Sequence, residues 1–169
     1  ATWVRILDVT PRRRVLSATL PPMPRATFTH EVTVPRSMQH LWERLQDANT
    51  YANIGPVEEV WDAVHDEDGI LQRYTWSTTV GRKPYEGSAR TVEAHNPQYL
   101  KMDLDAGEVA GSLATALEAV TEDVTNLAVT LEIVSKGTLS TLFFPVISDA
   151  VGRGLPEQVE AFAAAIAED

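Results

Sequence analysis

Apolar residues recur every four positions near the C-terminus. A four-residue step marks one face of an α-helix, so the sequence predicts one long C-terminal helix. Two prolines and two glycines lie inside it: Pro145, Gly152, Gly154 and Pro156. Because proline lacks an amide hydrogen and crowds the preceding turn, we expect a kink or break near 152–156, with both halves packed on the same sheet. The apolar ridge comprises Leu139, Phe143, Ile147, Val151, Leu155, Val159 and Ala163, with Phe162 and Ile166 on the same side.

Before this helix, short segments alternate apolar and polar residues, as half-buried strands do. Turn residues separate the segments, such as the run 66–69, in which Gly69 can adopt a positive φ. Strands are predicted at 27–34, 57–65, 70–80, 85–94, 99–105, 112–120 and 126–134.

Two short helices are predicted after the first strand. Ser37 offers an N-cap for a helix over 38–46, and a helical turn at 50–54 ends at Gly55-Pro56. The order of elements predicts an α+β fold: a curved antiparallel sheet of about seven strands wrapped around the long C-terminal helix.

The first 25 residues differ from the rest. They contain five arginines, one aspartate and a Pro-Pro-Met-Pro cluster, whereas the 169-residue chain has a net charge of −10. We therefore predict a basic, proline-rich arm at 1–25 and one domain at 26–169. The acidic body argues against a nucleic-acid partner. The run Arg12-Arg13-Arg14 leaves open a weak contact with a membrane surface, although a solvated arm is the favoured interpretation.

Several kinds of chemistry lack support in the sequence. The chain has no cysteine, so thiolate catalysis and disulfides are excluded. Gly152-Arg153-Gly154 lacks the third glycine of a dinucleotide fingerprint, and no nucleophile elbow is present. We expect no cofactor and no metal, because the histidines have no ligand spacing. Without a membrane-length apolar run or signal-peptide pattern, a cytoplasmic location is expected. The four histidines are His30, His40, His65 and His95.

The order of elements resembles the helix-grip fold of the START/SRPBCC superfamily, which includes the birch pollen allergens. The similarity covers roughly residues 26–167, and two branches look most similar: the polyketide cyclase/dehydrase-like group and the G-type accessory proteins of carbon monoxide dehydrogenase. Four segments resemble structural motifs of this superfamily: Val34-Pro35 leading to Leu41-Trp42, Tyr51 with 54–60, the stretch 92–100, and Phe143-Phe144-Pro145-Val146-Ile147.

The resemblance implies a cavity between sheet and helix that binds a hydrophobic or aromatic small molecule, and we expect a few hundred cubic ångströms. Aromatic side chains with a polar handle suit such a site, although aromatics in a sheet are more often core or cross-strand pairs. Arg90 could anchor a carboxylate or enolate, but an outward orientation is favoured. The candidate ligand-binding residues are Trp61, Tyr74, Trp76, Tyr85, Arg90, Met102, Leu113, Leu117, Phe143 and Ile147.

Three functions remain open. The favoured one is non-enzymatic binding or transport of a lipophilic molecule. The second is a polyketide cyclase/aromatase-type enzyme, for which Arg90 with Tyr74 or Tyr85 is the best polar pair. The third is a membrane- or partner-docking adaptor that resembles the G-type accessory proteins of carbon monoxide dehydrogenase and uses the basic arm. The ligand, any catalysed reaction and the oligomeric state stay undetermined at this point.

Overall fold

The structure is a computed structural model that describes residues 24–52, 57–80 and 82–168, without the side chains of residues 80, 138–140 and 143. Residues 1–23 of the predicted arm therefore lie outside the described residues. The elements are β1 (Arg25–Val34), α1 (Met38–Leu45), the 3-10 helix η2 (Ala48–Tyr51), β2 (Val57–His65), β3 (Leu71–Val80), β4 (Lys83–His95), β5 (Tyr99–Asp105), β6 (Val109–Thr121), β7 (Val124–Ser135) and α2 (Thr138–Glu168).

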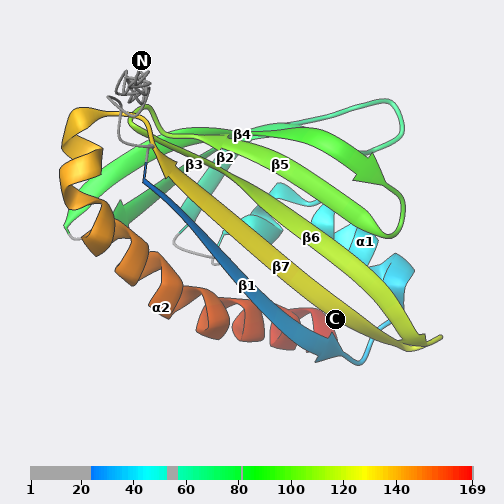
Figure 1. The fold of residues 1–169 in the computed structure, drawn as a ribbon. Coiled ribbons are helices and arrows are strands. Elements are labelled where there is room, and N and C mark those ends of the chain that lie inside the picture. Colours follow the sequence, from blue (N-terminus) through cyan, green and yellow to red (C-terminus); the bar gives the residue numbers. More distant parts are fainter. Residues whose placement is uncertain (1–23, 53–56, 81, 169) are drawn as a thin grey trace, which may run out of the picture.

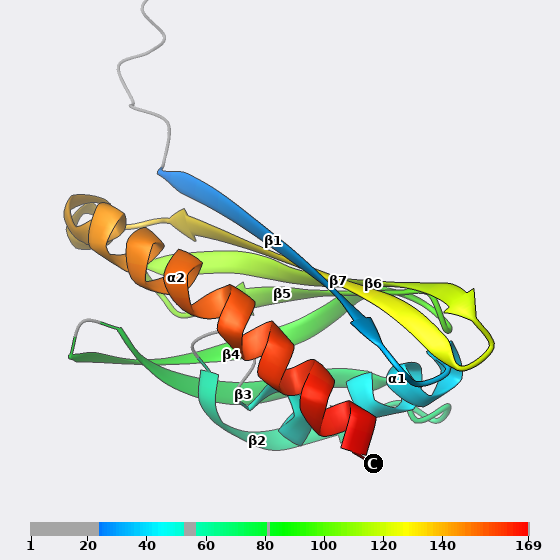
Figure 2. The ribbon, with the colours of Figure 1, turned by 90° about the horizontal axis from the view of Figure 1, so that it is seen from below.

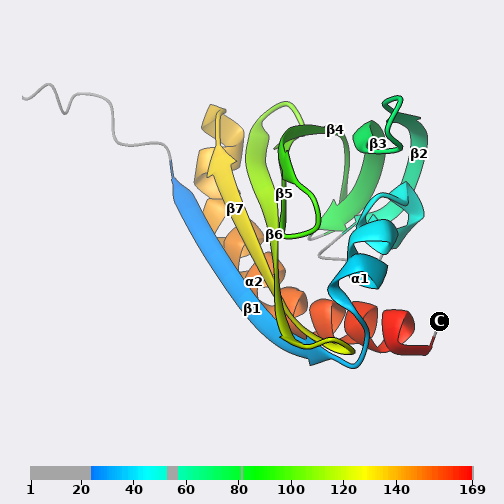
Figure 3. The ribbon, with the colours of Figure 1, turned by 90° about the vertical axis from the view of Figure 1, so that its right-hand side faces the viewer.

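The seven strands form one antiparallel sheet in the order β1-β7-β6-β5-β4-β3-β2 (Figure 1). The sheet curves around α2, and α1 lies at the side of β2 and β3 (Figure 3). The predicted α+β architecture, with a sheet wrapped around a long terminal helix, is confirmed. Alternation places one face of most strands inside, whereas β2 has no buried residue. In β7 the buried apolar residues are Leu127, Val129, Leu131 and Ile133.

The two short helices begin with side-chain caps. Ser37 Oγ accepts a hydrogen bond from the His40 amide at 3.2 Å, which confirms Ser37 as the N-cap of α1. Asp47 Oδ1 accepts from the Asn49 amide at 3.0 Å at the start of η2. The second helix thus begins earlier than the predicted turn at 50–54. Both helices lie near the C-terminal end of α2, as Figure 2 shows.

The long helix α2 runs from Thr138 to Glu168 without interruption, through both prolines. Of the kink or break predicted near 152–156, the break is therefore wrong. Val151 and Val159 are buried on either side of this segment, and Leu155 is buried within it. Packing of this ridge on the sheet outweighs the local cost of glycine and proline, because tertiary contacts dominate helix stability in proteins.

The helix packs chiefly on β1 and β7. At Gly152 the helix packs closely on a side chain of β1: a Cβ added there would lie 2.5 Å from Cε1 of Phe28. Farther along, His30 Nε2 of β1 lies 2.8 Å from Glu160 Oε1 of α2. These two contacts hold the helix against one edge of the curved sheet.

The two glycines of α2 provide a matched test of this contact. Gly154→Ala should raise the free energy of unfolding by about 0.5–1 kcal/mol, because alanine favours the helix and the nearest atoms are 3.5 Å away on flexible Gln158. Gly152→Ala gains the same helix propensity, but its added Cβ would overlap the Phe28 ring. This substitution should therefore lower the free energy of unfolding by about 1–2 kcal/mol. Urea unfolding measures both. Equal stabilisation by the two substitutions would contradict a close helix–strand contact at Gly152.

Candidate ligand-binding cavity

Three large or polar residues of β3 point inward in alternation. Tyr74, Trp76 and Thr78 are 3%, 7% and 5% exposed, whereas the residues between them are less buried. The period of a strand places every second side chain on the same face. The prediction that Tyr74 and Trp76 share a sheet face is therefore confirmed.

The neighbouring strand β4 carries small residues opposite these bulky ones. Gly87 pairs with Trp76, and Ala89 pairs with Tyr74. A Cβ on Gly87 would lie 2.5 Å from Cζ2 and 2.8 Å from Cε2 of Trp76, so the indole rests directly on the glycine. The pairing of large with small residues leaves room between the sheet and α2.

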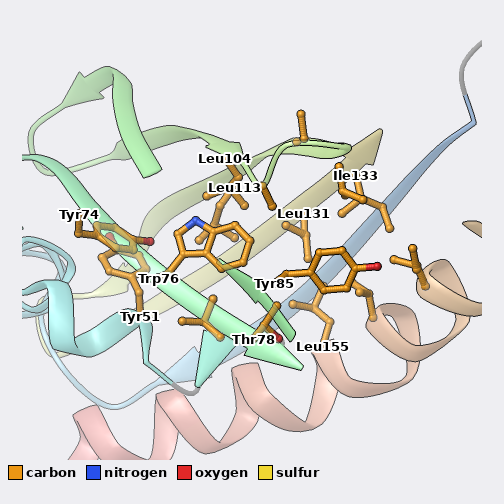
Figure 4. Close-up of a pocket in the computed structure, with 17 residues that line it drawn as sticks. Tyr51, Tyr74, Trp76, Thr78, Tyr85, Leu104, Leu113, Leu131, Ile133 and Leu155 are labelled. Atoms are coloured by element: carbon orange, nitrogen blue, oxygen red, sulfur yellow. The ribbon is translucent and has the colours of Figure 1, made fainter. Parts of the chain in front are cut away.

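The resulting cavity has a volume of about 80 Å³ and an almost wholly apolar wall (Figure 4). This is smaller than the predicted few hundred cubic ångströms, because the aromatic side chains fill much of the space. It still has room for several waters or a small ring. The wall comprises Tyr51, Val57, Tyr74, Trp76, Thr78, Tyr85, Leu104, Ala106, Val109, Ala110, Gly111, Leu113, Leu131, Ile133, Ile147, Val151 and Leu155.

Two stacked tyrosines close one end of the cavity. The rings of Tyr51 and Tyr74 lie 5.4 Å apart at an angle of 17°. The Tyr51 hydroxyl donates a 2.6 Å hydrogen bond to the backbone carbonyl of Leu45. Burial raises the pKa of Tyr74 above its ordinary value of 10.0, and burial with the proximity of Tyr74 raises the pKa of Tyr51. Both phenols are therefore neutral at pH 7.

Several solved structures are similar to this fold. Norcoclaurine synthase from Thalictrum flavum aligns with a TM-score of 0.61 at 15% identity, covering 88% of this chain and 98% of that chain. An aromatase/cyclase from Streptomyces sp. R1128 gives 0.59 at 19% identity, covering 86% and 90%. A START superfamily protein from Mycobacterium smegmatis gives 0.56 at 15% identity, covering 80% and 97%. No family profile and no curated protein sequence matches the chain.

The chain has the START/SRPBCC helix-grip fold. At these identities the similarity concerns the fold alone. The predicted resemblance to this superfamily is thereby confirmed at the level of architecture.

The structure brings five of the predicted site residues together in the cavity and places the other five elsewhere. Among the predicted residues outside the cavity, Trp61 is 36% exposed, and the Arg90 side chain is exposed on β4. Met102 and Leu117 are buried in the core outside the cavity wall, and the side chain of Phe143 lies outside the described residues. Those that line the cavity are Tyr74, Trp76, Tyr85, Leu113 and Ile147.

Some wall residues were not among the predicted site residues although a signal was present. Thr78 follows Tyr74 and Trp76 at the strand period, and extending that period would have found it. Val151 and Leu155 had been placed on the apolar ridge of the terminal helix, at the helical step of four from Ile147, but had not been assigned to the site. Tyr51 carried no such signal, because its contact with the cavity depends on how η2 packs beside β3.

Other parts of the described chain offer weaker sites. A hollow of about 420 Å³ between η2 and the end of α2 is bounded by Arg44, Asn49 and Phe162 among others, and another of about 570 Å³ lies beside Arg73 on the outer face of the sheet. No group of three or more histidines and carboxylates in the described residues is placed to hold a metal ion. None of the described helices is long and apolar enough to cross a membrane.

The buried tyrosines predict how stability depends on alkaline pH. A phenol whose pKa is raised on folding stays neutral in the folded state while the unfolded chain ionises, so stability should fall as pH rises above 10.0. Tyr74→Phe should make this fall shallower by up to about 1.4 kcal/mol per pH unit. Urea unfolding between pH 9 and 11.5 measures the slope. An unchanged slope would show that Tyr74 ionises in the folded protein.

Proposed function

We propose that this protein binds or carries a small aromatic or apolar molecule in the cavity between the sheet and α2. The proposal rests on the nearly continuous apolar wall of this cavity, to which the rings of Trp76 and Tyr85 contribute (Figure 4). Ligand sites of proteins are concave, lined by apolar and aromatic groups, and contain few polar atoms. The small volume favours a molecule of one or two rings.

The structural neighbours support the size and character of such a ligand. Norcoclaurine synthase, which shares this fold at 15% identity, has been solved with dopamine and hydroxybenzaldehyde, both of which contain a single aromatic ring. Removing a ring of this size from water releases enough free energy to support binding, at about 25 cal/mol per Å² of apolar surface. The preformed wall lowers the ordering cost of association.

The cyclase/aromatase alternative has less support in the cavity wall. Proton transfer in a cyclase requires groups that gain and lose a proton near neutral pH. In the described part of the chain, no carboxylate, imidazole, amine or guanidinium lines the cavity. Arg90 is exposed and Tyr74 is held neutral by burial. Binding is therefore the favoured proposal over cyclisation, with a cytoplasmic location still a prediction.

The docking-adaptor alternative draws on a different surface. Leu142 and Val146 lie one turn apart on α2 and are 70% and 59% exposed. Exposed apolar residues at a helix end are compatible with docking, but two side chains make a small patch. Co-sedimentation with anionic vesicles, with and without residues 1–25, distinguishes this function from binding in the cavity.

Two valine substitutions on α2 test the proposed cavity. Val151→Phe adds a ring to a residue that is 4% exposed and lines the cavity, so naphthalene should bind at least tenfold more weakly. Val146→Phe makes the same change at an exposed position of the same helix and should leave the affinity unchanged. Ligand-observed NMR titration gives the dissociation constants, and circular dichroism confirms that both variants are folded.

Two results would count against the proposal. Naphthalene binding that survives Val151→Phe unchanged would place the ligand outside the cavity. Absence of binding to the wild-type protein for naphthalene and for toluene, at concentrations near their solubility, would contradict a site for small aromatic molecules.

A further inference from the structure

Four residues with a side-chain hydroxyl belong to the wall of the cavity: Tyr51, Tyr74, Thr78 and Tyr85. The Tyr51 hydroxyl donates a 2.6 Å hydrogen bond to the Leu45 carbonyl, and Thr78 already interacts with another part of the chain. Tyr85 is half-buried at the end of the cavity opposite Tyr74, where water can hydrate it (Figure 4). The Tyr74 hydroxyl therefore remains for a molecule inside the cavity.

Tyr74 is deeply buried, yet its hydroxyl opens to the cavity. The residue is 3% exposed and Oη makes no hydrogen bond within the described part of the chain, so that burial alone raises its pKa. The indole nitrogen of Trp76 is enclosed by protein atoms, whereas the Tyr74 oxygen retains accessible surface. In Figure 4 this oxygen points from the stacked tyrosines toward Trp76, along the cavity. Its hydrogen-bond partner must therefore come from the contents of the cavity.

The position of this hydroxyl is fixed before a ligand arrives. The Tyr74 ring stacks on Tyr51 at 5.4 Å, and the Tyr51 hydroxyl is tied to the backbone at Leu45. Strand pairing with Ala89 of β4 sets the place of Tyr74 in the sheet. A group that is already held in place loses little freedom on binding, which favours selective recognition.

The Tyr74 hydroxyl is expected to donate a hydrogen bond to the ligand. A phenol can donate and accept, but if it only accepted from a ligand, its own proton would stay unpaired. Unpaired buried donors are rarer in proteins than unused acceptor lone pairs, and each costs free energy. Water is a poor permanent partner, because a buried water needs two to four polar neighbours and this wall is almost wholly apolar. A ligand oxygen that replaces such a water keeps the hydrogen bond to Tyr74 and brings apolar contact with it.

The same wall determines the charge of the ligand. No cationic side chain lines the cavity in the described residues, so a carboxylate would be buried without a counter-charge; equally, no carboxylate is present to receive an amine. Lys83 lies over the Tyr85 ring, with Nζ 5.1 Å from the ring centroid, and is not part of the wall. A carbonyl or ether oxygen would pair with the Tyr74 proton without bringing a charge or a further proton into the cavity.

We infer that the ligand is a small neutral aromatic molecule with a carbonyl or ether oxygen that accepts a hydrogen bond from the Tyr74 hydroxyl. This inference rests on the proposed function and specifies its substrate class. Tyr74 is then the residue that determines specificity, whereas Tyr51, Trp76 and the aliphatic part of the wall supply contact for the ring of the ligand.

An isosteric pair of compounds measures the contribution of that oxygen. Acetophenone carries a carbonyl, and α-methylstyrene replaces its oxygen by a methylene group. Ligand-observed NMR titration gives the ratio of the dissociation constants for α-methylstyrene and acetophenone. Tyr74→Phe removes the hydroxyl and keeps the ring, so it should lower this ratio about three- to tenfold, the size expected for one net hydrogen bond. Benzoate, an anion of similar shape, should bind the wild-type protein at least tenfold more weakly than acetophenone.

Two matched controls make the same change at other hydroxyls of the wall. Tyr51→Phe removes a hydroxyl that is already bonded to Leu45, and Tyr85→Phe removes one at the opposite end of the cavity. Both should leave the ratio unchanged. Circular dichroism shows whether the three variants are folded.

A second measurement does not depend on any variant. Isotope-edited infrared spectroscopy follows the carbonyl stretch of labelled acetophenone, and a hydrogen bond to the oxygen lowers the frequency of that stretch. In the wild-type protein the bound compound should absorb at a lower frequency than it does in hexane. A bound carbonyl stretch equal to that in hexane would overturn the inference.

The outcomes distinguish this inference from the proposed function. If acetophenone and α-methylstyrene both bind, but the ratio survives Tyr74→Phe, the inference is overturned and the binding function stands. A ratio that falls with Tyr85→Phe in place of Tyr74→Phe overturns the assignment to Tyr74, and tight binding of benzoate overturns the assignment of a neutral ligand. If neither neutral compound binds, the proposed function and the inference fail together.

Discussion

The close contact between α2 and β1 determines the rest of the architecture. Because Gly152 has no side chain, the helix axis approaches Phe28 more closely than any other residue would allow. The 2.8 Å contact between His30 and Glu160 holds the next turns against the same strand. The helix packs chiefly on this edge of the curved sheet. The space between β2–β7 and the ridge of Ile147, Val151 and Leu155 is the cavity.

The shape of that cavity is a consequence of strand register. Trp76 lies over Gly87 and Tyr74 faces Ala89, so each bulky residue of β3 meets a small one of β4. A slip of one residue would turn every one of these side chains to the opposite face of the sheet. The same backbone hydrogen bonds between strands therefore fix both the sheet and the positions of the side chains that line the candidate site. Changes to the site and changes to stability are accordingly hard to separate.

Periodicity predicted the elements well and the site only in part. Alternation and the four-residue step gave the strands, the long helix and the shared face of Tyr74 and Trp76, since both depend on local geometry. The sheet face on which Trp61 lies could not be predicted from alternation. Strand β2 contains register shifts and Asp62 has a φ of 54°, and both interrupt the period of two. Met102 and Leu117 point inward as alternation requires, yet their distance from the cavity depends on where α2 crosses the sheet.

Selectivity in such a cavity arises more from the free-energy cost of burying unsuitable groups than from attraction to the preferred ligand. The apolar wall accepts any ring of suitable size with similar free energy, because hydrophobic burial is non-directional. A wall without counter-charges disfavours ions, because a buried charge without a partner costs free energy. The Tyr51 hydroxyl is satisfied by the Leu45 carbonyl, so this residue contributes ring surface to the wall without selecting among ligands.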